Sequence, residues 1–546
     1  MRITILLTFI NLHFLFAQYN FTNPLENIVV TGNFAEIRNN HFHAGLDLRT
    51  DPVKHLPIYS IEKGYVSRIK VSSYGYGKII YITHQNGIVS VYAHQHRFSD
   101  RIEKHVREKQ AEKETFEIEI IPNKNAIPVT KGEVIGYTGN TGSSEAPHLH
   151  FELRDEKTEV ALNPLLYFKF KDDIAPDLNR IYFFETTDLN NPEIIYRIPI
   201  NKKKTTLKKG NSSSIKEFNS DELIQLPECS GFAFSAFDQH ELNGSVNQIY
   251  TAELYLDDAL FYRHAFDSIA FDKTRYINCF TELGKTKGEK IQKCFLSKNE
   301  NLPIFKTINP SGELFLKDTL IHKLRLVLSD ANNNKNISVF KIKKSNKMKF
   351  ITPVKKKYDC FKEIILKHTD AEVVFKEKTF FNDVDVYLEK ISTDLIEINA
   401  NVQSVFQAFT IKIKPDKLIN DTSKYCIIEK TKNTYCGGSF KNGFVVASSK
   451  HLGVFNVTTD TIPPQITQMK KNKLNKLVFK VSDNLSGIGE FKLYLNEKWQ
   501  YAEYEYKNNM IFCPKDEKIP KGKYKFRLKV LDKKKNAKEI TGFVFL

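Results

Sequence analysis

The chain contains 546 residues, which is more than one hydrophobic core accommodates, so we expect two to four domains. Hydrophobic residues make up 41% and aromatic residues 12% of the chain, enough for ordinary globular packing. The formal net charge is +17, but the lysines are scattered and form no patch interleaved with aromatic residues. This pattern argues against binding of nucleic acid.

The first residues have the features of an export signal. Arg2 provides a small basic region, residues 3–16 form an apolar run, and Ala17 ends the run at a candidate cleavage point. We expect residues 1–17 to be a signal peptide and the mature protein to be exported, periplasmic or extracellular, and associated with the cell envelope. No later apolar run approaches the roughly 18–20 residues that span a bilayer, so no transmembrane segment is expected in the mature chain.

Residues 18–170 are predicted to form an antiparallel β domain. Short alternating apolar runs, such as residues 78–84, are separated by glycines. An insert from Phe98 to Asn125 is polar and charged, and Ile102 and Val106 in it have the spacing of one helix face. For this insert we favour a solvated surface helix over a wall of the substrate groove.

Two short motifs indicate a metal site. His148 and His150 are two residues apart, so on an extended strand both side chains would face the same way. His43 and Asp47 would also share one face of a strand, and Gly45 between them would leave space for the metal to approach. Two imidazoles and one carboxylate suit a catalytic zinc site, which takes three protein ligands and keeps a fourth position open for water.

Four motifs occur in a fixed order within residues 25–168: H-x-G-x-D, Y-A-H, G-x-T-G and H-L-H-F-E. This ordered set resembles the lysostaphin-type (M23, LytM-like) zinc endopeptidases, in particular envelope-associated members of Bacteroidota-type bacteria. The resemblance implies an antiparallel β-sheet peptidase domain, one Zn²⁺ per chain and peptidoglycan peptides as the substrate. By position, it implies His43, Asp47 and His150 as zinc ligands and His94 and His148 as catalytic residues.

The remainder of the chain contains an internal sequence repeat. Two similar segments, residues 173–176 and 460–464, each resemble the start of a domain, and each precedes a similar set of short alternating strands. The matching strand segments are residues 234–238 with 479–483, and 324–330 with 526–532. This pattern predicts two immunoglobulin-like sandwiches with a β-rich module between them. The expected ranges are 173–345 for the first sandwich with insertions, 346–460 for the β-rich module and 461–546 for the second sandwich.

The positive charge is concentrated beyond residue 170. Residues 18–170 contain 18 basic and 18 acidic side chains, and the part from residue 171 onward carries +16 of the net +17. Acidic envelope polymers are one candidate partner for this surface. The alternative, lysine enrichment of solvated faces, is the one we favour, because the lysines do not cluster.

All seven cysteines also lie beyond the N-terminal domain. Because exported proteins are able to form disulfides, Cys426 with Cys436 and Cys279 with Cys294 are candidate pairs. Buried, reduced thiols are the alternative for all seven. No C-x-x-C spacing is present, which argues against a thiolate zinc site.

Taken together, the residues predict a mainly β chain in which a peptidase domain of antiparallel sheets is followed by immunoglobulin-like β-sandwich modules. The predicted activity is zinc-dependent hydrolysis of peptide cross-links of bacterial peptidoglycan in the cell envelope. Two alternatives stay open: a non-catalytic envelope scaffold or hydrolase activator with the same fold, and a protease of envelope proteins. Every metal and catalytic position carries the expected residue type, which argues against the scaffold.

Overall fold

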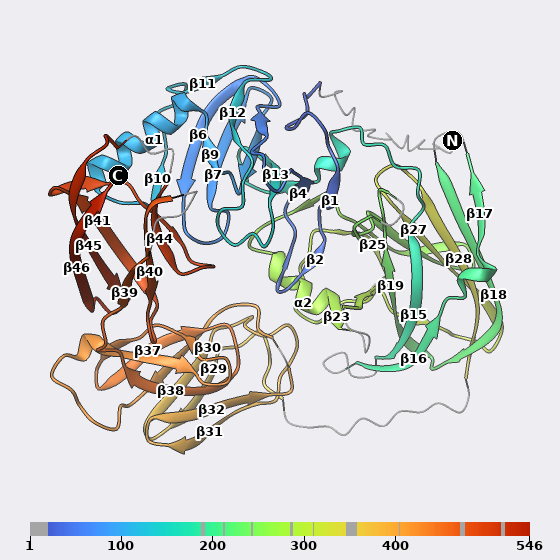
Figure 1. Ribbon diagram of the computed structural model, residues 1–546. Helices are drawn as coiled ribbons and strands as arrows, with labels where there is room; N and C mark the ends of the chain where they lie inside the picture. Colours follow the sequence, from blue (N-terminus) through green and yellow to red (C-terminus); the bar gives the residue numbers. More distant parts are fainter. Residues whose placement is uncertain are drawn as a thin grey trace, which may run out of the picture.

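The structure is a computed structural model whose fold is mainly β, which confirms the predicted fold class (Figure 1). It describes residues 20–186, 192–210, 213–241, 244–283, 288–309, 311–345, 357–402, 404–469, 475–514 and 519–546. The predicted signal peptide, residues 1–17, lies outside these ranges. Within them, no helix is both long enough and apolar enough to cross a membrane.

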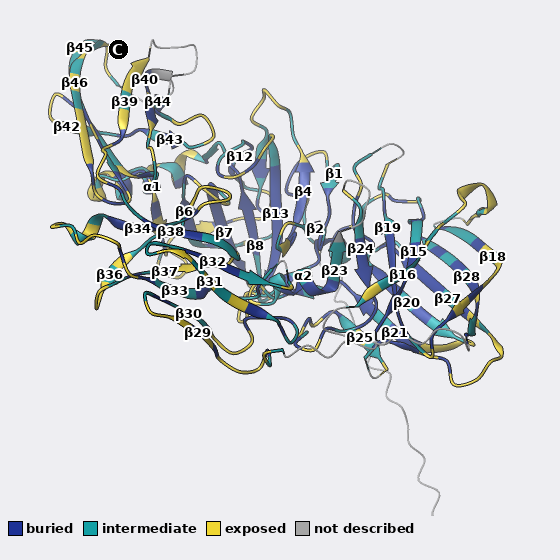
Figure 2. Ribbon diagram, turned by 90° about the horizontal axis from the view of Figure 1, so that it is seen from below, coloured by how far each residue is buried: buried dark blue, intermediate teal, exposed yellow. Residues whose placement is uncertain are grey.

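The N-terminal domain is built on a large antiparallel sheet. Its central strands are buried on both faces, as Figure 2 shows for β4, β13 and β8. The main strand order is β1 (Val30–Gly32), β4 (Leu46–Arg49), β13 (His148–Asp155), β8 (Ile88–Ala93), β7 (Lys78–His84), β6 (Gly64–Val71) and β10 (Ile118–Ile120). The smaller strands are β2 (Ile37–Arg38), β3 (His41–Phe42), β5 (Pro57–Tyr59), β9 (Arg97–Phe98), β11 (Pro128–Val129), β12 (Val134–Tyr137) and β14 (Ala161–Leu162).

Two sheets pack face to face to form the first sandwich, which follows the N-terminal domain. One sheet contains β16 (Glu193–Pro199), β15 (Asp177–Glu185), β19 (Cys229–Phe237), β24 (Lys290–Lys293) and β23 (Thr281–Leu283), with β26 (Leu314–Phe315) at β19. The other contains β17 (Thr206–Lys209), β18 (Ser214–Leu226), β28 (Lys335–Lys344), β27 (Ile321–Ser329), β20 (Thr251–Leu256), β21 (Ala259–Ala265) and β25 (Phe305–Ile308). The strand β22 (Ser268–Ile269) and the short helix α2 (Ile277–Phe280) lie between them and the N-terminal domain.

The two remaining units are also pairs of sheets. In the middle module, one sheet contains β29 (Ile364–His368), β30 (Ala371–Phe375), β33 (Phe409–Ile413), β37 (Phe444–Ser449) and β36 (Ser439–Lys441). The other sheet contains β31 (Val386–Ser392), β32 (Leu395–Ala400), β38 (Gly453–Thr459), β34 (Tyr425–Glu429) and β35 (Thr434–Tyr435). In the C-terminal sandwich, one sheet contains β39 (Gln465–Met469), β40 (Asn475–Ser482), β44 (Met510–Pro514) and β43 (Glu503–Glu505). The other sheet contains β42 (Lys498–Gln500), β41 (Ile488–Leu495), β45 (Lys523–Asp532) and β46 (Ala537–Phe545).

The first sandwich is joined to the N-terminal domain by backbone pairing. Strand β22 adds to the edge of the N-terminal sheet through β14, with Ala161 opposite Ile269. Nearby, the buried Asn33 side chain bridges the same two units: its Nδ2 donates to the Gln248 carbonyl at 2.6 Å, and its Oδ1 accepts the Gln248 amide at 2.9 Å. The sheet of the N-terminal domain is therefore braced from this side by a second domain.

The C-terminal sandwich contacts the opposite side of the N-terminal domain, at the charged insert (Figure 1). The insert forms helix α1 (Asp100–Lys113), which buries Ile102 and Val106 as their spacing predicts. The expectation of a solvated surface helix is only partly met, because the Arg107 guanidinium lies over the ring of Tyr501 in the C-terminal sandwich. No local sequence pattern reveals this contact, since its two sides are almost 400 residues apart.

A buried ion pair fixes this interface. Lys78 Nζ and Glu503 Oε1 lie 2.8 Å apart, and their side chains are only 5% and 14% exposed. Burial, the largest effect, raises the pKa of Glu503, but the Lys78 ammonium and the Arg107 guanidinium outweigh it and hold the pKa below its ordinary value. Removing one member of such a pair leaves an uncompensated buried charge.

All seven cysteines lie in described parts of the chain, and all seven are free thiols. The candidate disulfides Cys426–Cys436 and Cys279–Cys294 are therefore not formed. Five of the seven cysteines are buried, as the reduced alternative requires.

We predict that docking of the C-terminal sandwich is lost in acid. A folded-state pKa below the unfolded value stabilises the docked state above about pH 4.3, and this stabilisation disappears as the pH falls through the lowered pKa of Glu503. Protection of α1 and of residues 501–507 against hydrogen exchange, measured relative to the intrinsic rate at each pH, is expected to fall as the pH drops below about 4.3. Glu503→Gln is expected to show the faster exchange already at pH 7, whereas the exposed control Glu539→Gln is not. Equal exchange in the wild type and Glu503→Gln at pH 7 would contradict the assignment.

Candidate metal centre

Three side chains converge at the centre of the N-terminal sheet. His43 Nε2 lies 2.9 Å from His150 Nδ1 and 3.0 Å from Asp47 Oδ1, and His150 Nδ1 lies 3.0 Å from the same carboxylate oxygen. Strand β13 pairs with β4 so that His150 stands directly opposite Asp47. Within the described chain, His43, Asp47 and His150 form one of four groups whose ligand atoms all lie within 4.8 Å of one another. The sheet register therefore brings together residues about 100 positions apart.

The hydrogen bonds of both histidines leave a lone pair pointing inward. His43 Nδ1 lies 2.8 Å from the carbonyl oxygen of Asn33, which only accepts, so this nitrogen carries the proton. His150 Nε2 lies 2.8 Å from Glu152 Oε1. Burial raises the pKa of Glu152, but Arg154 and His150 lower it to about 2, so Glu152 is ionised and His150 Nε2 is the donor. In the neutral form, the inward nitrogens and Asp47 Oδ1 are three acceptors facing one another, an arrangement that fits a cation.

The electrostatics of the site favour positive charge at this point. Burial, the largest effect, lowers the pKa of His150, but hydrogen bonds to Asp47 and Glu152 together raise it to about 9. Asp47 stays ionised, because the neighbouring histidines hold its pKa well below the usual range against the effect of burial. The set of two imidazole nitrogens and one carboxylate oxygen suits Zn²⁺, with which the proton on His150 would compete.

Arg38, Tyr76, Glu152 and Arg154 complete the surroundings of the three ligands. Arg38 donates to the second oxygen of Asp47 and thereby orients the carboxylate. Glu152 is fully buried and accepts from Tyr76 Oη at 2.6 Å and from Arg154 Nε at 2.7 Å. The sequence analysis assigned no role to these residues. The H-L-H-F-E motif contained the signal for Glu152, because a residue at i+2 from His150 shares its face of the strand.

The two histidines assigned catalytic roles by resemblance lie beside the three ligands. His148 Nε2 is 3.2 Å from Asp47 Oδ1, and the His94 ring centroid is 4.9 Å from that of His148. His148 Nδ1 contacts the carbonyl of Ala146, and His94 Nδ1 contacts the carbonyl of Thr141, both at 2.8 Å. Each carbonyl holds the proton on Nδ1, which leaves Nε2 of both rings able to accept one.

His94 directly follows strand β8, which ends at Ala93, and its backbone is in the left-handed region, with φ of 58°. This backbone turn is uncommon for a residue with a side chain and directs the ring toward the cluster. Burial, the largest effect, together with the nearby charges of His150 and His148, lowers the pKa of His94 to about 3. His94 is therefore a neutral imidazole at pH 7.

Two geometric expectations need correction. His43 does not share a strand with Asp47, because β3 ends at Phe42 and the chain bends before β4 begins at Leu46. Gly45 does not make room for a metal. A Cβ at Gly45 would lie 2.3 Å from the carbonyl oxygen of Phe151, so the glycine allows β13 to approach closely.

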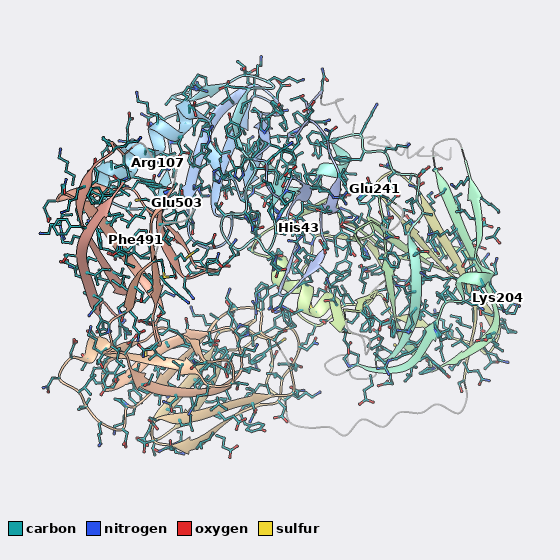
Figure 3. All side chains as sticks on the ribbon, in the orientation of Figure 1. His43, Arg107, Lys204, Glu241, Phe491 and Glu503 are labelled. Carbon is teal, nitrogen blue, oxygen red and sulfur yellow. The ribbon has the colours of Figure 1, made fainter. Side chains whose placement is uncertain are left out.

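The C-terminal sandwich reaches the rim of this site. Lys507 Nζ donates to the backbone carbonyls of Asn140 at 2.7 Å and Ser144 at 3.0 Å. Ser144 Oγ is in turn 3.2 Å from His148 Nδ1. Figure 3 shows the labelled Arg107, Glu503 and Phe491 together where α1 meets this sandwich, with His43 deeper in the molecule.

Comparison with known families agrees with the geometry. Residues 41–111 and 123–164 match the model of Peptidase family M23. The N-terminal domain of this chain is of the M23 peptidase type. The middle module matches a second model, that of the Zu5-like domain, over residues 356–460.

Curated relatives match 112 residues of this chain. DD-carboxypeptidase/endopeptidase Mpg of Neisseria meningitidis serogroup B (strain MC58) is 33% identical over 112 residues, which are 20% of this chain and 20% of the relative. The protein of the same name from Neisseria gonorrhoeae is 32% identical over 112 residues, with the same coverage. The match thus spans about a fifth of the length of these relatives.

Among solved structures, the catalytic domain of lysostaphin from Staphylococcus simulans is 21% identical. That similarity covers 26% of this chain and 90% of the lysostaphin domain, with a TM-score of 0.19. The catalytic domain of the M23 protein EnpA from Enterococcus faecalis is 22% identical with the same coverage and TM-score. Similarity at this level carries no argument about activity.

We predict that Glu152→Gln weakens zinc binding by about 10- to 100-fold, because the amide no longer ensures that the proton of His150 stays on Nε2. The measurement is competition for zinc between the full chain and a chelator of known affinity. The matched control is Glu156→Gln, an exposed glutamate just beyond the same strand. Unchanged zinc affinity in Glu152→Gln would show that the residue does not position His150.

Proposed function

We propose that this protein is a zinc-dependent endopeptidase that hydrolyses peptide cross-links of bacterial peptidoglycan in the cell envelope. The observation that carries the proposal is the convergence of His43, Asp47 and His150, with His94 and His148 alongside, in a domain of family M23. The Neisseria relatives are named as carboxypeptidase and endopeptidase, which supports a peptide substrate.

The proposal assigns a role to each group. His43, Asp47 and His150 would hold the zinc, which when bound polarises a carbonyl and lowers the pKa of water. One of His148 and His94, each with its own proton fixed on Nδ1, would accept the proton of the attacking water at Nε2. That ring would then stabilise negative charge on the carbonyl oxygen and pass the same proton to the leaving amine, while the other ring assists by hydrogen bonding.

Export and the partners of the C-terminal part belong to the same proposal. A wall-directed hydrolase acts outside the cytoplasm, in agreement with the signal peptide predicted at residues 1–17. Binding of acidic envelope polymers by the basic part of the chain from residue 171 onward stays a prediction.

The test is release of cross-linked muropeptides from purified peptidoglycan by the full mature chain. We expect His148→Ala to lower the rate about 100-fold or more while retaining zinc, because it removes proton transfer and leaves the ligands in place. The control is His368→Ala, an exposed histidine in the middle module.

Two results would contradict the proposal. One is a zinc-loaded wild type that releases nothing, which would favour the scaffold. The other is a His148→Ala variant that is as active as the wild type. Cleavage of envelope proteins without muropeptide release would instead favour the protease alternative.

A further inference from the structure

Three aspartates gather where the chain enters the C-terminal sandwich. Asp460 follows strand β38, Asp483 follows β40 and Asp532 ends β45, so three separate segments meet at one end of the sandwich. One carboxylate oxygen from each lies within 4.8 Å of the other two. We call Asp460, Asp483 and Asp532 the C-terminal acidic cluster. None of the three belongs to the M23 domain.

Two of the three aspartates are buried, Asp483 is partly buried, and two oxygens of the cluster have no hydrogen-bond donor. Asp460 and Asp532 are both 0% exposed. Asp460 Oδ1 and Asp483 Oδ1 are buried without a protein partner, although Asp460 Oδ2 accepts the amide of Ser486 at 3.1 Å. Burial of a carboxylate oxygen without a donor costs free energy. Two such oxygens in a group of three carboxylates, with one oxygen of each gathered within 4.8 Å, point to a cation.

Protein cations do not neutralise the cluster. Over the described residues, no lysine, arginine or histidine forms an ion pair with any of its three carboxylates. The neighbouring Lys534 directs its ammonium elsewhere, donating to the carbonyls of Gly438 at 2.7 Å and Ser423 at 3.1 Å. Among the described residues, the three carboxylates therefore have hydrogen-bond donors but no cation in an ion pair with them.

The first sandwich repeats this construction at its own entrance. Asn536 donates to Asp532 Oδ2 and to the backbone carbonyl of Asp460. In the first sandwich, Asn334 donates to Asp330 Oδ2 and to the carbonyl of Asp172 in the same way. The repetition extends to the third aspartate, since residues 234–238 echo residues 479–483.

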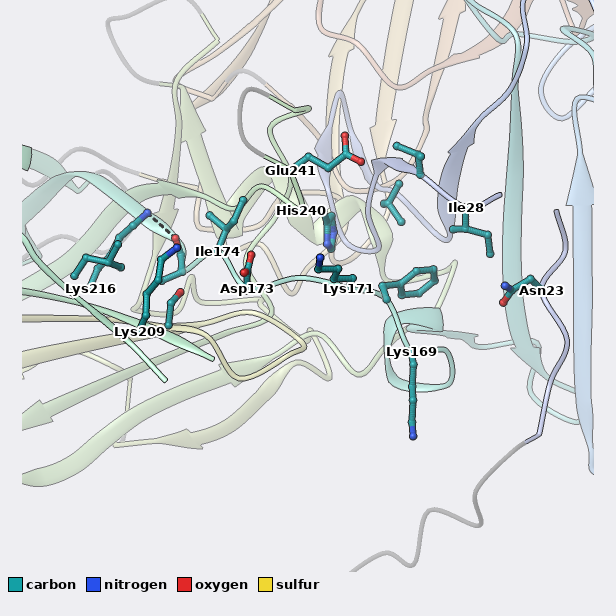
Figure 4. Close-up of a pocket in the computed structure, with 16 residues that line it drawn as sticks. Asn23, Ile28, Lys169, Lys171, Asp173, Ile174, Lys209, Lys216, His240 and Glu241 are labelled. Atoms are coloured by element: carbon teal, nitrogen blue, oxygen red, sulfur yellow. Dashed lines mark hydrogen bonds between the residues drawn. The ribbon is translucent and has the colours of Figure 1, made fainter. Parts of the chain in front are cut away.

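The third aspartate of the first sandwich, Asp238, is 2% exposed and its Oδ1 has no protein partner. Asp172, Asp238 and His240 have ligand atoms within 4.8 Å of one another, and His240 lines a cavity of about 750 Å³ (Figure 4). Both sandwiches thus have a buried carboxylate oxygen without a protein partner at the same position, although their sequences differ. This repetition supports a cation-binding site of the same design in both.

The ligand set identifies the class of cation. The C-terminal acidic cluster offers only oxygen atoms as ligands. Ca²⁺ prefers oxygen ligands, whereas zinc and copper are bound more selectively by imidazole nitrogen and by sulfur. Three carboxylates from three segments also suit the larger, flexible coordination shell of Ca²⁺ better than the strict octahedron of Mg²⁺. We propose that Asp460, Asp483 and Asp532 bind one calcium ion, which clamps the entrance of the C-terminal sandwich.

The consequence concerns the placement of the sandwich. Asp460 is the last residue before this unit, and the unit carries Glu503 and Lys507, which contact the M23 domain and the rim of its metal centre. A calcium ion at this junction would restrict the hinge between the middle module and the C-terminal sandwich. The proposal does not depend on the activity proposed for the M23 domain.

The test is calcium titration of the zinc-loaded full chain by calorimetry. We expect saturable binding with a Kd on the order of 10⁻⁴–10⁻³ M, as in other extracellular calcium modules. Asp483→Asn is expected to reduce the calcium stoichiometry by one, and the control Glu539→Gln, which removes one exposed charge from the same sandwich, is not. An unchanged stoichiometry in a folded Asp483→Asn variant would overturn the proposal.

A second measurement needs no variant. Hydrogen exchange of the zinc-loaded wild type is compared with and without millimolar calcium. We expect calcium to slow exchange in the three segments 460–464, 483–487 and 532–536. Unchanged exchange in these segments, or absence of saturable binding at millimolar calcium, would overturn the proposal even if the variants failed to fold.

Discussion

The carboxylate of Asp47 is the interaction on which the metal centre depends. Its Oδ1 lies within 3.2 Å of nitrogens of His43, His148 and His150, and its other oxygen is held by Arg38. Strand pairing of β4 with β13 sets this arrangement, because it places His150 directly opposite Asp47. A shift of one residue in this register would turn both β13 histidines to the other face of the sheet.

The histidines around Asp47 are oriented by groups that accept a hydrogen bond from the outer nitrogen of each ring. Backbone carbonyls do this for His43, His94 and His148, and Glu152 does it for His150. The same principle thus fixes all four tautomers. Loss of a partner that orients a ligand in this way typically lowers metal affinity or activity by about 10- to 100-fold.

Two other domains brace the site. Gln248 of the first sandwich holds Asn33, whose carbonyl orients His43. Lys507 of the C-terminal sandwich holds the loop of Ser144, which contacts His148. The M23 domain is therefore in direct contact with both sandwiches. A change in either sandwich is able to reach the metal centre through these hydrogen bonds.

The sequence was informative where chemistry follows from local spacing. The face shared by His148 and His150 follows from strand periodicity, and the mainly β fold follows from the alternating runs. His94 was assigned only by resemblance, because nothing local reveals that β8 lies beside β13. The reasons given for His43 and Gly45 were wrong, since a bend and a close strand contact replace the expected continuous strand.

The contacts of Arg107, Glu503 and Lys507 were beyond prediction, because they join segments about 350 to 425 residues apart whose pairing no single sequence encodes locally.

The central claim is that His43, Asp47 and His150 bind one zinc ion. The most direct measurement is zinc stoichiometry together with X-ray absorption spectroscopy of the full chain, compared with His150→Ala. We expect one zinc per chain, coordinated by nitrogen and oxygen at about 2.0–2.2 Å without sulfur, and its loss in His150→Ala. A chain that binds no zinc, or one whose zinc is held by sulfur or is retained in His150→Ala, would contradict the claim.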